Sequence, residues 1–310
     1  MKVLITGGAG YVGTELVSAL LHQEVVDEII VYDNLSRDNY NLFLGHTLYH
    51  TNPFNKIKIT FVSGELLDSR KLGTILQGVD VVFHLAAKVL TPFTTTSGHE
   101  FEQTNHWGTA ELVYAIEESK VKRLIYMSST SVYGSAHANE ETTPDPQTLY
   151  GISKLRGEEH VRRLFDKLDT YIIRCGNVYG YNRSMRFDAV INRFMFEANF
   201  KRRISIHGNG KQSRAFIHIK SVADVLARML DANVPSGIYN LVEKNLQVLD
   251  IVDIMKEIYP DLEFIFVNQH LTLRELTVDT HLKLSQYLSD ILPNNPLQKE
   301  LTYFKQHFSF

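Results

Sequence analysis

The 310-residue sequence predicts an α/β fold, a doubly wound parallel sheet with a smaller, interleaved C-terminal lobe. Three observations predict this class. A buried strand pattern at residues 2–6 passes directly into a glycine-rich turn. Further strand patterns alternate with helical periodicity up to residue 175. No repeat, low-complexity tract or flexible linker divides the chain, whose length suits one large domain and a small lobe.

The first strand and its turn carry the clearest signal. Residues 2–6 form a continuous β-branched and apolar run, typical of a strand buried on both faces. The run Gly7-Gly8-Ala9-Gly10-Tyr11-Val12-Gly13 follows, and then a helical pattern. This is the context of a Rossmann dinucleotide fingerprint. Gly7 permits the tight turn, Gly10 lets the backbone approach a pyrophosphate, and Gly13 lets helix and strand pack closely.

The second strand, residues 28–32, ends at Asp33. A carboxylate here accepts hydrogen bonds from the ribose hydroxyls of adenosine and repels a 2′-phosphate, which favours NAD over NADP. Arg37 lies nearby in the sequence and could soften this preference. The alternative is that Asp33 only caps a turn.

Two more strands follow a polar insertion. Residues 57–62 alternate as a third strand, and residues 80–87 form a fourth strand that runs into small residues. The insertion, residues 34–55, holds His46 and His50 at a spacing that suits metal ligands on a helix. No third ligand accompanies them, so we predict no metal site.

A proton-transfer device is predicted between Leu124 and Lys154. A strand pattern meets a polar run that contains Ser129, and Tyr150 and Lys154 follow at a four-residue helical spacing. A phenol titrates near pH ~10, and a neighbouring ammonium lowers that pKa. A hydroxyl such as Ser129 can share the proton. The alternative is a chance pair on an amphipathic helix.

Composition excludes several classes. The net charge of −3 gives no basic face for nucleic acid, and no polybasic segment indicates a membrane anchor. We expect neither a signal peptide nor a membrane span, since no apolar run reaches 18 residues. The single cysteine, Cys175, rules out an internal disulfide and favours a cytoplasmic location.

Together these segments resemble the extended short-chain dehydrogenase/reductase family, in particular its nucleotide-sugar epimerase and dehydratase branch, which includes UDP-glucose 4-epimerase. The resemblance covers residues 1 to about 245. Its motifs occur in family order: residues 6–13, 33–35, 84–87, 128–134, 150–154, Arg174, and residues 177–180, 214–218 and 237–240.

The resemblance implies NAD as cofactor and a nucleotide-diphosphate sugar as substrate. It makes Tyr150 the acid/base, Lys154 its partner and ligand of the nicotinamide ribose, and Ser129 the catalytic hydroxyl. Cofactor contacts are expected from Gly7, Gly10, Tyr11, Val12, Gly13, Asp33, Asn34, Glu65, Leu66, Leu85, Ala86, Ala87, Tyr150, Lys154 and Cys175. Substrate contacts are expected from Lys88, Ser129, Asn177, Arg214 and Arg274.

Arg214 is the best diphosphate ligand, because a guanidinium makes two parallel bonds to phosphate oxygens; a surface salt bridge is its alternative. By the same resemblance Asn105 is a structural residue behind the active site. Glu65 stands where relatives usually carry Asp.

Departures from the family pattern reduce the number of reactions that the resemblance allows. Thr130 and Ser131 stand where sugar 4,6-dehydratases have acidic residues, so elimination of water is disfavoured. Ala215 and Tyr181 replace residues that are often Asp and Pro near the substrate. We therefore predict an NAD-dependent nucleotide-sugar epimerase that acts at C4 through a transient 4-keto intermediate. An NAD(P)-dependent keto-sugar reductase or dehydrogenase, a 4,6-dehydratase and a non-catalytic dinucleotide-sensing scaffold stay open.

We expect an NAD-binding domain over residues 1–175, with returning segments at about 213–242, and a substrate-binding lobe over residues 176–310. Helices are expected over residues 190–199 and 297–308 in the lobe. A homodimer through helices near 100–119 and 150–167 is expected by resemblance only.

Overall fold

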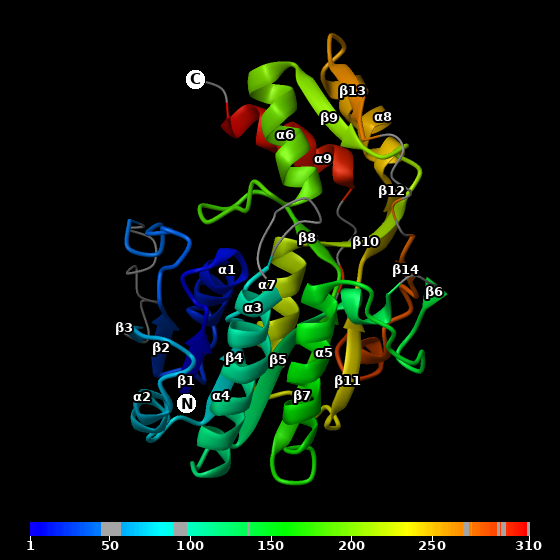
Figure 1. Cartoon of the computed structure of the whole chain (residues 1–310). Coiled ribbons are helices and arrows are strands. Elements are labelled where there is room, and N and C mark those ends of the chain that lie inside the picture. Colours follow the sequence, from blue (N-terminus) through cyan, green and yellow to red (C-terminus); the bar gives the residue numbers. More distant parts are fainter. Residues whose placement is uncertain are drawn as a thin grey trace.

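The computed structural model describes residues 1–44, 57–89, 98–134, 137–268, 273, 275–289, 292 and 296–308. A seven-stranded, fully parallel sheet forms its centre, so the predicted α/β fold is confirmed (Figure 1). The strands lie in the order β11 (Gly237–Leu241), β7 (Asp169–Cys175), β5 (Arg123–Ser129), β4 (Val81–His84), β1 (Lys2–Thr6), β2 (Glu28–Asp33) and β3 (Lys58–Ser63). The order reverses between β1 and β4, where such sheets bind ligands beyond the carboxyl ends of their strands.

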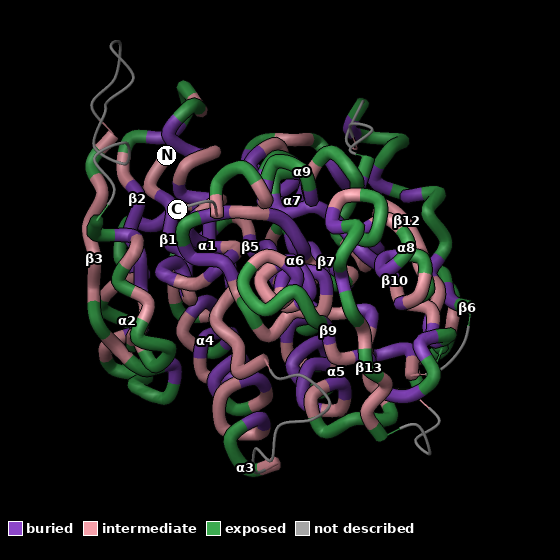
Figure 2. The backbone as a smooth tube through the Cα atoms, turned by 90° about the horizontal axis from the view of Figure 1, so that it is seen from above, coloured by how far each residue is buried: buried purple, intermediate pink, exposed green. Residues whose placement is uncertain are grey.

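Helices cover both faces of this sheet, because successive side chains of a strand point to opposite faces. Val3 and Ile5 of β1 pack in the same core as α1 (Tyr11–Leu20) and α7 (Ile219–Arg228). Leu4 packs in a second core on the other face. The helices on that face are α2 (Ser69–Ile75), α4 (Gly108–Glu117) and α5 (Leu149–Arg162). In Figure 2 buried stretches gather at the centre of the molecule and exposed stretches at its rim.

The lobe has its own small sheets and core. One sheet has the order β12 (Lys244–Gln247), β10 (Ser213–His218), β8 (Asn177–Tyr179), and a parallel pair joins β13 (Glu263–Val267) to β9 (Arg203–His207). Three helices pack with them: α6 (Val190–Lys201), α8 (Val248–Ile258) and α9 (Leu297–His307). The predicted lobe helices are thus present with slightly different ends.

The remaining described elements are short. These are α3 (Gly98–Phe101), a π-helix (Glu102–Trp107), two 3₁₀ turns (Thr130–Tyr133 and Lys283–Gln286), and the parallel bridge of β6 (His137–Ala138) with β14 (Thr277–Val278). Among the described helices, none has the length and apolar character needed to cross a membrane.

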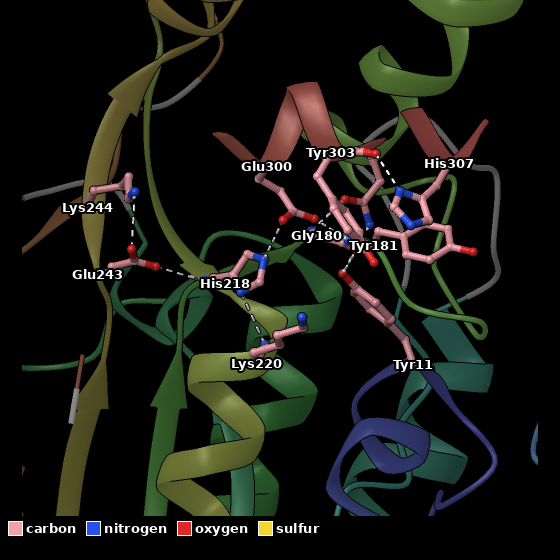
Figure 3. A network of polar contacts seen from close by, with 11 residues as sticks. Tyr11, Gly180, Tyr181, His218, Lys220, Glu243, Lys244, Glu300, Tyr303 and His307 are labelled. Carbon is pink, nitrogen blue, oxygen red and sulfur yellow. Dashed lines mark hydrogen bonds and ion pairs between the residues drawn. The ribbon is translucent and has the colours of Figure 1, made fainter. Parts of the chain in front are cut away.

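Polar contacts lock the lobe to the glycine turn (Figure 3). The Tyr11 hydroxyl, at the start of α1, donates a hydrogen bond of 2.5 Å to the Gly180 carbonyl. The next residue, Tyr181, donates its backbone N–H to Glu300 of α9 at 2.6 Å. Glu300 also forms an ion pair of 3.1 Å with His218 at the end of β10. The first helix, the loop after β8 and the last helix therefore form one connected unit.

A buried ion pair joins α5 to the sheet. Arg174 of β7 donates two hydrogen bonds to Glu158 of α5, at 3.0 and 2.7 Å, and Ser128 of β5 donates a third at 2.5 Å. The Arg174 guanidinium also lies 4.7 Å from the centre of the Tyr133 ring. Removing either Arg174 or Glu158 would leave the other charge buried, where water cannot solvate it.

We expect Arg174→Met to lower the free energy of unfolding by about 3–5 kcal/mol, since Glu158 would be buried without its counter-ion. The control is Arg163→Met, which breaks the exposed pair with Glu117 and should cost about 0–1 kcal/mol. Urea denaturation of both variants measures the difference. Equal losses would contradict this role for the buried pair.

Candidate active site

A cavity of about 760 Å³ opens at the carboxyl edge of the central sheet and extends into the lobe. All predicted site residues that the structure describes line it. From the sheet side and α5 these are Gly7, Gly10, Tyr11, Val12, Gly13, Asp33, Asn34, Glu65, Leu66, Leu85, Ala86, Ala87, Lys88, Ser129, Tyr150, Lys154 and Cys175, and from the lobe Asn177 and Arg214. Arg274, His46 and His50 lie outside the described residues.

The glycine turn has the geometry that a dinucleotide needs. Gly7 has a φ of +71°, and a Cβ there would lie 2.6 Å from the Ala86 backbone. A Cβ on Gly13 would lie 2.5 Å from Gly8 Cα, so both positions exclude a side chain. Gly10 starts α1, whose first-turn N–H groups have no partners within the helix. These groups can bind the phosphates of a dinucleotide.

Asp33 is fixed at the end of β2 by the turn itself. One carboxylate oxygen accepts the Ala9 N–H at 3.0 Å and the other accepts the Leu35 N–H at 2.8 Å. Burial raises the pKa of Asp33, although these backbone N–H groups act in the opposite direction. Beside it, Asn34 donates to both oxygens of Glu65 at 3.1 and 3.0 Å. These oxygen acceptors suit the ribose and adenine end of NAD.

The N-terminal turn of α5 places the phenol of Tyr150 in the cavity. The Thr148 hydroxyl caps the helix by accepting the Gly151 N–H at 3.0 Å. Gly151 lets the helix lie against the 3₁₀ turn after β5, since a Cβ there would be 2.6 Å from the Ser131 carbonyl oxygen. Burial raises the pKa of Tyr150, while its hydrogen bond with Ser129 and the nearby Arg186 act in the opposite direction.

Lys154 lies one turn farther along α5 and is 2% exposed. Its ammonium lies 4.2 Å from the centre of the Tyr126 ring. Burial lowers the pKa of Lys154 to about 7, and Glu158 acts in the opposite direction. The structure therefore brings together the predicted hydroxyl, phenol and amine.

Two polar residues behind this group belong to the scaffold. The His84 ring bonds Thr6 at 2.7 Å and Thr109 at 2.9 Å, and burial lowers its pKa to about 3, so the ring is neutral. Asn105, within the π-helix, bonds the N–H and the carbonyl of Lys88 at 2.8 and 2.9 Å. It thus joins this helix to the loop after β4, consistent with its expected structural role.

The lobe contributes polar groups to the far part of the cavity. Asn177 donates to the Ala215 carbonyl at 3.0 Å, and Arg214 donates to the Ser213 carbonyl at 2.8 Å. Cys175 lies at the end of β7. Burial raises the pKa of its thiol to about 12, so it is not a thiolate at neutral pH.

Several lining residues were not predicted. Arg186 forms a bidentate pair with Asp188 at 3.0 and 2.6 Å, and Arg193, His207 and Gln212 line the lobe end of the cavity. Arg37, named above beside Asp33, also lines the cavity and donates to the Val89 carbonyl at 2.7 Å. The sequence signals near the residues that were not predicted were the basic residues after residue 182 and the motif at residues 214–218.

Comparison with known proteins agrees with this geometry. The chain matches the model of the NAD dependent epimerase/dehydratase family over residues 3–241. It is 31% identical over 265 residues to the dTDP-D-glucose 4,6-dehydratase of Mus musculus, with 83% of this chain and 72% of the relative covered. It is 30% identical over 238 residues to the uncharacterized UDP-glucose epimerase YtcB of Bacillus subtilis, with 74% and 72% covered.

Among solved structures, the chain is similar to a Tyr-to-Phe mutant of the UDP-glucuronic acid 4-epimerase from Bacillus cereus, in complex with NAD and UDP-4-deoxy-4-fluoro-glucuronic acid. The TM-score is 0.86 at 25% identity, with 99% of this chain and 100% of that chain covered. The predicted cofactor, NAD, is confirmed by the family and by this neighbour. This chain belongs to the NAD-dependent epimerase/dehydratase family.

Proposed function

We propose that this chain is a nucleotide-sugar epimerase that inverts C4 through a transient 4-keto intermediate. The observation that supports it is the arrangement of Ser129, Tyr150 and Lys154 in a cavity that can also hold the dinucleotide. Such a group removes a proton from an alcohol. It does not by itself eliminate water.

The cavity's carboxylates support epimerisation over dehydration. Those among the described lining residues are Asp33, Glu65 and Asp188. The first is held by backbone N–H groups, the second by Asn34 and the third by Arg186. Thr130 and Ser131 provide neither an acid nor a base for elimination across C5–C6.

In the proposed mechanism Tyr150, as phenolate, takes the proton of the sugar 4-hydroxyl, and Ser129 relays it. The Ser129 hydrogen bond favours the phenolate against the burial that raises the pKa of Tyr150, and Lys154 would hold the nicotinamide ribose. When bound, NAD supplies the reversible hydride chemistry at C4. Inversion then requires the 4-ketose to offer its other face to the cofactor. Asn177 and Arg214 hold the diphosphate while the sugar turns about its phosphate linkage.

We also propose a homodimer that buries the face formed by the π-helix, α4 and α5. On this face Trp107 is 49% exposed and stacks on His106 with ring centres 4.5 Å apart. Helix–helix interfaces commonly bury such aromatic side chains.

The protein's single, buried cysteine supports a cytoplasmic location.

The experiment that tests the proposed reaction uses purified protein, its released cofactor and a panel of nucleotide sugars. We expect NAD to be released on denaturation, and a product of unchanged mass with inverted C4 to form without added cofactor. Consumption of external NADH or NADPH would instead indicate a reductase. Loss of one water from the sugar would indicate a dehydratase.

Tyr150→Phe should lower turnover roughly 10²- to 10⁴-fold, because the substituted ring cannot accept the proton. Nucleotide-sugar affinity should change little, which isothermal titration with the substrate identified above would show. The control is Tyr287→Phe, an exposed tyrosine that does not line the cavity. Near-normal turnover of Tyr150→Phe would rule out the proposed role.

Lys154→Met should abolish turnover and yet stabilise the cofactor-free protein. Lysine titrates near pH ~10.4 in an unfolded chain, whereas burial lowers the pKa of Lys154 to about 7 in the fold. The unfolded chain therefore binds more protons between these values, and the destabilising contribution of Lys154 is full below pH 7 and fades as the pH approaches 10.

The gain in the free energy of unfolding should be on the order of 4 kcal/mol near neutral pH and small near pH ~10. Urea denaturation of the wild type and Lys154→Met at both pH values measures it. An equal effect at both pH values would show that Lys154 is not buried as an ammonium ion.

A further inference from the structure

The lobe end of the cavity is where a nucleoside must lie if the proposed function holds. A nucleotide sugar is linear: sugar, diphosphate, ribose, base. With the sugar at Tyr150 and the diphosphate at Asn177 and Arg214, the base falls beyond them, toward α6 and β9. Figure 1 shows these elements at the end of the molecule away from β1. Val190, Phe194 and Val248 provide apolar walls there.

Arg193 of α6 lines this end, and some N–H donors of its guanidinium have no acceptor among the described residues. The group has five N–H donors. Its hydrogen bond among the described residues is a long one, 3.4 Å from Nη2 to the Ser205 carbonyl, and its buried Nε has no acceptor there. Glu197, whose charge acts on Arg193, instead pairs with Lys201 at 3.5 Å. Arg193 thus has donors for an acceptor that a ligand would bring.

Gln212, in the turn between β9 and β10, is 6% exposed and supplies the opposite function. Its Nε2 donates to the His207 carbonyl at 3.0 Å, which fixes the orientation of the amide. The other amide atom, Oε1, is therefore an acceptor, and it has no donor among the described residues. A buried acceptor without a donor costs free energy, so a ligand that brings a donor here would gain binding energy.

We propose that Arg193 and Gln212 read the base of the nucleotide sugar and select a keto base, one with a carbonyl next to a ring N–H. Arg193 donates to the carbonyl and Gln212 accepts from the ring N–H. Uracil, thymine and guanine have this edge. Cytosine has an amino group and an unprotonated ring nitrogen in the same places. Its amino group would face the donors of Arg193, and its ring nitrogen would face the acceptor of Gln212. This inference deepens the proposed function and rests on it for the direction of the substrate.

The test compares UDP with CDP, which have the same size and charge and differ in this edge. Isothermal titration of the NAD-loaded protein measures both dissociation constants. We expect UDP to bind roughly 5- to 150-fold more tightly, the range for a well-placed pair of base contacts. In Arg193→Met and in Gln212→Leu the ratio should fall toward one, mainly through weaker UDP binding.

The control is Arg203→Met on β9, where an exposed arginine pairs with Glu263 at 3.3 Å. It should keep the wild-type ratio. Equal affinities of UDP and CDP for the wild type would overturn the inference, even if a variant fails to fold. Equal weakening of both nucleotides in Arg193→Met would also overturn it and would place Arg193 at the phosphates.

These readouts are independent of the reaction. A preference for UDP that depends on Arg193, without epimerisation of any sugar, would support the base-reading role and refute the proposed epimerase activity. Epimerisation with no preference between UDP and CDP would support the proposed epimerase activity and refute the base-reading role.

Discussion

The active geometry depends on how α5 is held against the sheet. Tyr150, Lys154 and Glu158 follow one another at intervals of four residues and so share one face of the helix. Arg174 and Ser128, from two neighbouring strands, occupy both oxygens of Glu158. The helix cannot rotate or slide without breaking these buried bonds. A charge pair two turns from the phenol therefore sets where the phenol lies.

The same helix shows why catalytic sites are costly to fold. A close approach to the sheet needs Gly157, since a Cβ there would lie 2.5 Å from the Tyr126 hydroxyl. That approach removes water from Lys154, and its pKa falls because its charge is no longer solvated. The protein retains an amine that its own fold destabilises. Substrate chemistry, rather than stability, accounts for such a residue.

Much of the sheet and of the cofactor end could be predicted from the sequence. Strands buried on both faces leave continuous apolar runs, and the glycines at positions 7 and 13 are required by backbone contacts that no other residue allows. Asp33 and the Tyr150–Lys154 spacing are likewise local patterns. The structure places all of them around one cavity.

The lobe was less predictable because its contacts are not local. β9 pairs with β13, which is more than fifty residues away, and nothing in either strand specifies its partner. No motif surrounds Arg193, and Gln212 lies just before the motif at residues 214–218 without being part of it. They become candidates only when α6 and the β9–β10 turn place them at the same cavity, with atoms left unpaired. Such residues can be identified from the three-dimensional structure but not from sequence patterns.

The path of the chain has a consequence for its synthesis on the ribosome. The chain leaves the central sheet after β7, forms α6, β9 and β10 of the lobe, and returns to place β11 at the edge of the sheet. The sheet therefore cannot be completed until residue 241 has emerged, when α6 and its neighbours are already outside the exit tunnel. Strand β7 must wait with an open edge, the kind of exposed edge that chaperones protect in nascent chains.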